Sequence, residues 1–372
     1  MLGGRLGATV AQEAAKSRRF VDLFAGSGVV SHHVATKVSV SAISVDQLKF
    51  ATVLAASITR RVTPFDGRSA FDAWSRRAAA LEASYTSIAK RARELDQPLT
   101  EAAVVAAREF VASSDLGCFI WRDYGGYYLS PGQAFDLSML YRTLPRESPQ
   151  ATAALAALIR TASRCSASPG HTAQPFRPTS ALLPHIRSAW RSQARTVVQY
   201  ELESIARQHA RVRGFVFQGD AQLFVERHAR RGDLLFCDPP YSDAQYSRFY
   251  HLLEAIAIGG WESVQGAGRA PESSQRVASD FSRPPSAIDA MTRLISSAAD
   301  LGCVVMLTYP EGDRSNRLSS DDIKEIATPW FAIEEVRIPH RHSTLGGSPT
   351  SASGRAGRKE LDELLLTLRP RA

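Results

Sequence analysis

Asp238, Pro239, Pro240 and Tyr241 follow one another directly, and these residue types can do chemistry on an amino group. The apolar residues 234–236 before them predict a buried strand, which the two prolines bring to an end. An aspartate oxygen and the first proline carbonyl can accept both N–H bonds of an amino group attached to an aromatic ring, which frees the nitrogen lone pair. Tyr241 can stack on that ring. The structural alternative is an ordinary Asp-Pro-Pro turn beside a core tyrosine.

A glycine loop near the start of the chain predicts a second site. Residues 20–24 are typical of a buried strand, residues 25–28 (Ala-Gly-Ser-Gly) of a tight loop, and the chain from Val29 of a helix. Asp46 ends the next predicted strand, about 20 positions after the loop, where a carboxylate can take both hydroxyls of a ribose. Ser31 replaces the third glycine of a dinucleotide fingerprint, so we expect a nucleoside ligand without a pyrophosphate.

The strings FVDLFAGSG (20–28) and DPPYSDAQYSRFYHLLE (238–254) together resemble the D12 class of adenine-specific DNA methyltransferases. The resemblance implies transfer of a methyl group from S-adenosyl-L-methionine to adenine N6 in double-stranded DNA, after the base is flipped out, without a metal. It implies that residues 238–241 are catalytic. It also implies a cofactor site formed by Asp22, Phe24, Ala25, Gly26, Ser27, Gly28, Asp46, Gln47, Asp220, Ala221 and Asp238.

The resemblance and the strand pattern together predict the fold. We expect an α/β protein with a Rossmann-like S-adenosylmethionine-dependent methyltransferase sheet, an antiparallel final strand pair, and an inserted, mostly helical recognition domain. About 150 residues between two core strands are too many for an ordinary loop. We therefore predict the cofactor-binding half at 1–60, the inserted domain at 61–213 and the catalytic half at 214–372. One or two helices are expected at 71–113, with a break near Pro98, and single helices at 187–213 and 246–258, the last packed on the sheet. Strands are expected within 215–222, ending at Asp220, and at 304–310, 331–339 and 363–370.

The charge of the chain favours a polyanionic partner. Its formal net charge is +8 and its pI is near 9.5. Tyrosines among the basic residues could stack on bases, although a small core of tyrosines under a loop is an equally good interpretation. The basic helix at 187–213 could contact DNA, or its arginines could simply form a solvated surface. The predicted nucleic-acid contacts are Arg122, Tyr124, Arg191, Tyr246, Arg248, Arg276 and Arg283.

The remaining composition bears on compartment and cofactors. The chain has 4 cysteines without short spacing, which indicates neither a disulfide framework nor a zinc site and fits a reduced, cytoplasmic compartment without a membrane.

Two further predictions concern single residues. Asp220 has an alternative role as the N-cap residue of the helix that follows it. His340 and His342 lack a third ligand nearby, so a metal there is not favoured.

Other functions share parts of this pattern. Ribosomal RNA base methyltransferases resemble the chain in the Asp-Pro-Pro-Tyr turn and the glycine loop, but the long insert argues against them. Cytosine-N4 DNA methylation is a further alternative, although serine is more usual there at the first turn position. The resembled family also carries a basic, glycine-containing segment before the glycine loop. Here LGGRL at 2–6 is its counterpart, so we expect a shortened start that weakens the site for the cofactor carboxylate. A restriction endonuclease of the same system is a separate expectation for a protein partner.

Overall fold

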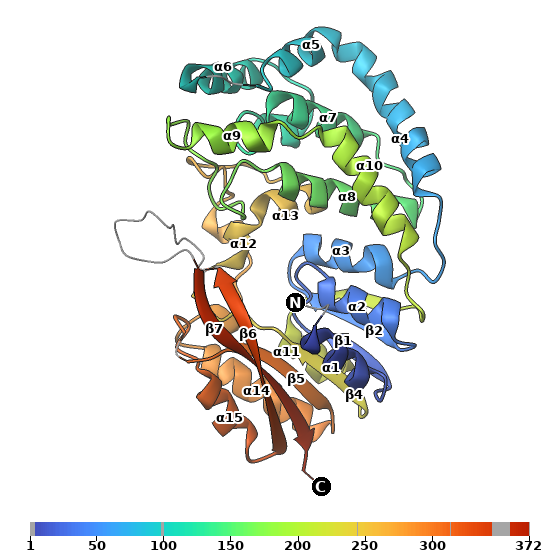
Figure 1. Ribbon diagram of the computed structural model, residues 1–372, viewed down its shortest axis with the longest axis vertical. Helices are drawn as coiled ribbons and strands as arrows, with labels where there is room; N and C mark the ends of the chain where they lie inside the picture. Colours follow the sequence, from blue (N-terminus) through green and yellow to red (C-terminus); the bar gives the residue numbers. More distant parts are fainter. Residues whose placement is uncertain (1–3, 98–99, 244, 313, 344–357, 372) are drawn as a thin grey trace. The chain divides into compact units, whose positions relative to one another are not determined.

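The computed structural model describes residues 4–97, 100–243, 245–312, 314–343 and 358–371. They divide into two compact units (Figure 1). The first, here called the sheet unit, comprises Met1–Ala55, Ala210–Tyr246 and Val277–Ala372. The second, called the helical unit, comprises Ala56–His209 and Ser247–Arg276. The predicted boundaries assigned residues 247–276 to the catalytic half, whereas here they pack with the helices.

The sheet unit is built on a 7-stranded sheet with the order β3-β2-β1-β4-β5-β7-β6. Strands β1 to β5 run parallel, and β7 runs antiparallel to both β5 and β6, so the predicted antiparallel final pair is confirmed. The direction of winding reverses between β1 and β4, which is where open α/β sheets bind ligands. The strands are β1 (Arg19–Asp22), β2 (Ser41–Asp46), β3 (Phe215–Gln218), β4 (Asp233–Cys237), β5 (Val304–Pro310), β6 (Phe331–Ser343) and β7 (Arg358–Pro370).

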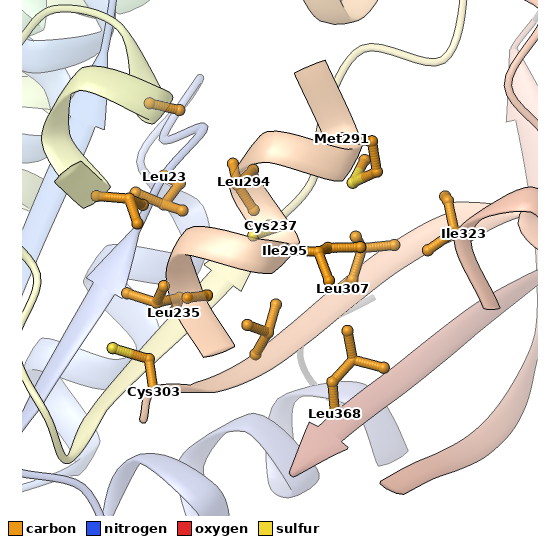
Figure 2. Close-up of a cluster of buried hydrophobic side chains, with 14 of the residues drawn as sticks. Leu23, Leu235, Cys237, Met291, Leu294, Ile295, Cys303, Leu307, Ile323 and Leu368 are labelled. Atoms are coloured by element: carbon orange, nitrogen blue, oxygen red, sulfur yellow. The ribbon is translucent and has the colours of Figure 1, made fainter. Parts of the chain in front are cut away.

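Helices cover both faces of this sheet. Leu234 and Phe236 face one apolar cluster, which includes residues of α1 (Arg5–Ala14) and α2 (Val29–Lys37). Leu235 and Cys237 face the other, which includes residues of α11 (Ala221–His228), α14 (Ala287–Asp300) and α15 (Ser320–Ala327). Figure 2 shows Leu294 and Ile295 of α14 gathered with Leu235 and Leu307 of the sheet. Because β4 is buried along its whole length, its carboxyl end is a rigid support for the residues that follow.

The helical unit differs in detail from its sequence-based expectation. The one or two helices predicted at 71–113 are three, and the helix predicted at 187–213 is two, divided near Ser192. Within the unit, α10 packs against α4 and α8. The helices are α4 (Gly67–Glu82), α5 (Thr86–Glu94), α6 (Glu101–Ala112), α7 (Pro131–Arg142), α8 (Gln150–Cys165), α9 (Leu183–Trp190) and α10 (Ala194–Arg207).

The helix predicted at 246–258 is corrected by the structure. It is two helices, α12 (Tyr246–Phe249) and α13 (His251–Ile258), with Tyr250 between them. We expected the apolar side chains of this segment to pack on the sheet. Instead α13 belongs to the helical unit, where it contacts α8, and Leu252 and Ile256 are buried there. The all-round apolar character of α13 fits burial against any partner, so its sequence did not identify which one.

Several further properties concern the described residues only. All four cysteines are free and buried. No described helix is long and apolar enough to cross a membrane. The described part of the chain contains no group of three or more His, Cys, Asp and Glu side chains arranged to hold a metal. His340 and His342 lie in β6, but their side chains are outside the described ones.

Candidate active site

Asp238 lies immediately after the carboxyl end of β4. Cys237 is opposite Leu307 in the parallel pairing of β4 with β5, so Thr308 comes beside Asp238. The Thr308 hydroxyl Oγ1 donates a hydrogen bond to Asp238 Oδ1 at 3.1 Å. Thr308 is itself buried and therefore holds the carboxyl from a fixed point of the sheet.

The environment of Asp238 raises the pKa of its carboxyl to about 6. Desolvation by the surrounding protein is the main cause, and the hydrogen bond from Thr308 acts in the opposite direction. By surface area Asp238 is exposed, so the carboxyl is surrounded by protein yet open to a ligand. At neutral pH such a group is mostly ionised and can accept N–H donors.

Asn316 holds the proline turn in place. Its Nδ2 donates to the Pro240 carbonyl at 3.2 Å and to the Phe281 carbonyl at 3.0 Å. Its Oδ1 accepts from the Tyr309 hydroxyl at 3.2 Å. Asn316 is fully buried, so this amide is a structural pin for the turn. The Pro240 carbonyl is thereby occupied, whereas no described residue donates a hydrogen bond to the Pro239 carbonyl.

Tyr241 ends the turn with its ring partly buried. It packs against the sheet unit's apolar cluster, and its ring meets that of Tyr309 edge to face, with centroids 6.5 Å apart and planes at 86°. An edge-to-face contact fixes the direction of a ring while leaving its face available for stacking.

The glycine loop follows β1 as expected. Gly26 has a φ of +49° and its N–H donates to Asp46 Oδ2 at 2.8 Å. A Cβ at Gly26 would meet no atom nearer than the Phe24 carbonyl oxygen at 3.9 Å, so the space above it is open. At Gly28, with φ +75°, a Cβ would lie 3.2 Å from the Ala55 backbone in α3 (Lys49–Thr59). Thus Gly26 borders open space, and Gly28 allows the close approach of α3.

Asp46 and Asp220 are both held by backbone groups. Asp46 also accepts from the Leu48 N–H at 2.8 Å, and burial raises its pKa although these backbone hydrogen bonds oppose the rise. Asp220 is the N-cap of α11 and accepts from the Gln222 N–H at 2.8 Å, as the capping alternative expected. Gln47 Nε2 donates to Asp220 at 2.8 Å, which joins the ends of β2 and β3. A cofactor role for Asp46, Gln47, Asp220 and the buried Ala221 stays a prediction.

Asp22 is the least satisfied acid of the site. It is 1% exposed, and its Oδ2 accepts from the Ser31 hydroxyl at 2.7 Å. Its Oδ1 has no hydrogen-bond partner among the described residues. Burial first, and then the charges of Asp238 and Asp46, raise its pKa to about 7. An orphaned buried oxygen at the end of β1 can accept a hydrogen bond from a ligand.

Two other members of the predicted cofactor site differ in setting. Phe24 packs edge to face against Phe281, with centroids 5.1 Å apart, and Ser27 is exposed at the loop tip. In the segment 2–6, predicted to be the counterpart of the family's basic segment, Arg5 and Leu6 begin helix α1, and residues 1–3 lie outside the described ones.

Of the predicted nucleic-acid contacts, Tyr124 is contradicted by the structure. It is fully buried with Tyr128, and both rings lie against that of His251, which leaves no face for a base. Burial lowers the pKa of His251 to about 4, as expected for a histidine enclosed by aromatic rings. The alternative of a small tyrosine core is therefore the right one.

The other predicted contacts lie nearer the surface. Arg122 is exposed and paired with Asp123, Arg283 is exposed near Asp280, Arg191 is exposed, and Tyr246 is half-buried. Arg248 and Arg276 share the lining of a recess of about 630 Å³ in the helical unit. The pKa of Arg276 is lowered, first by desolvation and then by the charge of Arg248, so the two guanidinium groups lie close enough to repel one another.

A comparison with known families finds a similarity over part of this chain. The family model described as D12 class N6 adenine-specific DNA methyltransferase matches residues 189–298. The matched segment includes Asp220, the turn 238–241, Arg248 and Arg276, whereas the glycine loop lies outside it. The match supports an enzyme with adenine-specific DNA methyltransferase activity, hence a transferase whose substrate is DNA. A search of curated proteins found no match.

Proposed function

We propose that the protein is a site-specific DNA methyltransferase that transfers a methyl group from S-adenosyl-L-methionine to adenine N6 by base flipping. The observation that carries the proposal is the turn after β4. There Asp238 offers a carboxylate held by Thr308, and the Pro239 carbonyl has no donor among the described residues while Asn316 occupies the neighbouring one. Two acceptors side by side match the two N–H bonds of one amino group.

The strand order supports a Rossmann-like methyltransferase sheet for the sheet unit. Five parallel strands that reverse winding between β1 and β4, with an antiparallel β7, put the turn at the carboxyl edge beside the switch point. We further propose that residues 61–213 form an inserted target-recognition domain. The helical unit supports this proposal, with residues 247–276 added to it.

The sheet edge fits S-adenosylmethionine in three respects. Gly26 borders open space, Asp46 stands at the end of β2 within reach of ribose hydroxyls, and Asp22 has an orphaned oxygen that an ammonium group can satisfy. When bound, the cofactor supplies a methyl group on a positively charged sulfur. The acids Asp22, Asp46 and Asp238 favour a cation at this edge because their charges add.

The residues of the turn then prepare the target nitrogen. Asp238 and the Pro239 carbonyl accept its two N–H bonds, so its lone pair is withdrawn from the ring and directed to the methyl carbon. Tyr241 stacks on the extruded base, which restores the stacking lost on leaving the duplex. Most of the acceleration comes from positioning, since the sulfonium carbon is already reactive.

Contacts with DNA are proposed for the basic surface residues. Arg248 and Arg276 line one recess, and a phosphodiester between them would relieve their mutual repulsion. Arg122, Arg191, Tyr246 and Arg283 are further proposed contacts. We also propose that the protein is cytoplasmic and that a restriction endonuclease of the same restriction-modification system is its partner.

Mapping of modified bases tests this proposal. Genomic DNA from cells that express the chain should contain N6-methyladenine at one recurrent sequence, and cells that express Asp238→Ala should lack it. Cytosine-N4 methylation, or methyl groups found in ribosomal RNA and not in DNA, would establish one of the alternatives in its place.

A further inference from the structure

Glu363 is a buried acid that the catalytic turn does not explain. It lies in β7, is 6% exposed, and its Oε2 has no hydrogen-bond partner among the described residues. A carboxyl buried in this way costs free energy unless it is protonated or serves a ligand or another acid. Its position in the sheet identifies the neighbour it serves.

The strand register places Glu363 at the edge of the sheet where Asp238 lies, with β5 between their two strands. In the antiparallel pairing of β5 with β7, Thr308 is opposite Leu365 and Pro310 is opposite Glu363. Opposed residues share a face of the sheet, and so do alternate residues of one strand. Glu363 therefore lies on the same face of the sheet as Thr308 and two residues nearer the carboxyl end of β5. Thr308 is the residue that donates a hydrogen bond to Asp238.

Among the described residues, Asp238 is the charged group that affects the pKa of Glu363. Burial first, and then the negative charge of Asp238, raise the pKa of Glu363 to about 7. On the other side of β7 its opposite residue is the apolar Ile338, and Leu365, on the same face as Glu363, belongs to an apolar cluster. Asp22 faces Asp238 from β1, so three acids share the edge. The negative charge of Asp238 raises the pKa of both Asp22 and Glu363, so ionisation of Asp238 opposes ionisation of the other two.

We propose that Asp238 and Glu363 change protonation state in opposite directions during methyl transfer: Asp238 receives a proton from the target amino group, and Glu363 releases its own proton to water. This inference rests on the proposed function. The nitrogen lone pair forms the bond to the methyl carbon, and the carbon–sulfur bond breaks with its electron pair on sulfur. The nitrogen then has one proton too many, which moves to the Asp238 carboxylate.

Glu363 makes this last step easier. Once Asp238 is neutral, its charge no longer opposes ionisation of Glu363, so the glutamic acid can lose its proton. The pair thus holds the same net charge before and after the step, and the site avoids accumulating protons. Glu363 is a positioning residue that acts through Asp238, and the substrate need not touch it.

The coupling can be measured without any activity. The carboxyl of Glu363 is titrated by NMR in protein labelled with ¹³C at glutamate, in the wild type and in Asp238→Asn. Loss of the Asp238 charge should lower the Glu363 pKa by roughly one pH unit. An unchanged Glu363 pKa in Asp238→Asn would overturn the proposal, even if the enzyme methylates adenine.

Stability provides a second readout. A glutamic acid whose pKa is raised from 4.5 to about 7 on folding stabilises the fold fully below about pH 4.5, and this contribution is lost as pH rises through about 7. Glu363→Gln should remove that loss, so its melting temperature should fall less over this range than that of the wild type. Glu334→Gln makes the same substitution at an exposed site on β6, and its melting temperature should change with pH as that of the wild type does. If the melting temperatures of Glu363→Gln and Glu334→Gln vary equally with pH over this range, the proposal is contradicted.

Kinetics completes the test. In single-turnover methyl transfer, Glu363→Gln should be about tenfold slower than Glu334→Gln near pH 7 and should lose one titration step from the pH profile, with unchanged cofactor affinity. Identical profiles for the two variants would refute the proposed role of Glu363 in the protonation change. If the wild type transfers no methyl group to DNA, the proposed function fails, and the NMR titration still decides the coupling. If Glu363→Gln does not fold, the Asp238→Asn titration decides it.

Discussion

Thr308 and Asp238 are joined by a hydrogen bond of 3.1 Å between Oγ1 and Oδ1, although they are 70 residues apart in the chain. The bond runs from β5 to the turn after β4, so the sheet itself positions the acceptor carboxylate. Because the Thr308 hydroxyl donates a stronger hydrogen bond to the carboxylate than to the neutral acid, it lowers the pKa of Asp238 and opposes the larger rise that desolvation causes.

Methyl transfer should depend on the ionisation of Asp238. The pKa of this carboxyl is about 6, so the single-turnover rate should fall as pH drops through about 6, where the acceptor becomes protonated. Thr308→Val removes a hydrogen bond that lowers this pKa, so its midpoint should move to higher pH, whereas Thr308→Ser should keep the wild-type midpoint. The same midpoint in both variants would show that the threonine hydroxyl has no such effect.

Asn316→Ala should disrupt the turn and the fold together. The buried amide serves the carbonyls of Pro240 and Phe281 and the hydroxyl of Tyr309. Leaving these groups unpaired should reduce the free energy of unfolding by about 2–4 kcal/mol, measured by urea denaturation. Asn316→Asp keeps the acceptor oxygen but loses both N–H donors, so it should also lose methyl transfer. Wild-type turnover in Asn316→Asp would show that the Asn316 amide is not needed to hold the turn for methyl transfer.

Tyr241 should act through its ring area. Tyr241→Ala should lower methyl transfer by about 10-fold or more, because stacking of one base on an aromatic ring is worth roughly 1–3 kcal/mol. Tyr241→Phe and Tyr241→Trp keep a stacking face and should retain most of the rate in the same assay. If all three substitutions cause the same loss, the hydroxyl, and not the ring, would be the functional group.

Arg248 and Arg276 should contribute to DNA affinity through phosphate charge. Arg248→Gln and Arg276→Gln should each weaken binding of duplex DNA and reduce the slope of log K against log salt by about 1. Binding is measured by fluorescence anisotropy over a salt series. Arg68→Gln on α4 removes the same charge from an exposed site paired with Asp72, and it should change the slope less. Equal slopes in all three variants would mean that the recess does not bind phosphate.

The sequence predicted the parts of the site that are local in the chain. The turn at 238–241, the glycine loop and Asp46 are each defined by a few adjacent residues with strong backbone preferences. The antiparallel final pair was also predicted, because two apolar runs at the end of the chain have few other ways to join the sheet. These features follow from local chemistry.

The parts that were missed depend on long-range packing. Thr308, Asn316 and Glu363 are ordinary residues in or after strands, and only the register of β5 with β4 and β7 brings them to the turn. The same limit explains Tyr124, whose burial against His251 joins segments 127 residues apart. It also explains α13, whose apolar residues fit a sheet or a helix equally well, and which packs on α8.

The most direct test of the central claim is a methyl-transfer assay with purified protein, duplex DNA and cofactor labelled in the methyl group. The wild type should form N6-methyladenine, and Asp238→Ala should form none even at cofactor concentrations that calorimetry shows to saturate the variant. Transfer by Asp238→Ala at a rate near that of the wild type, or label found on a base other than adenine, would contradict the account.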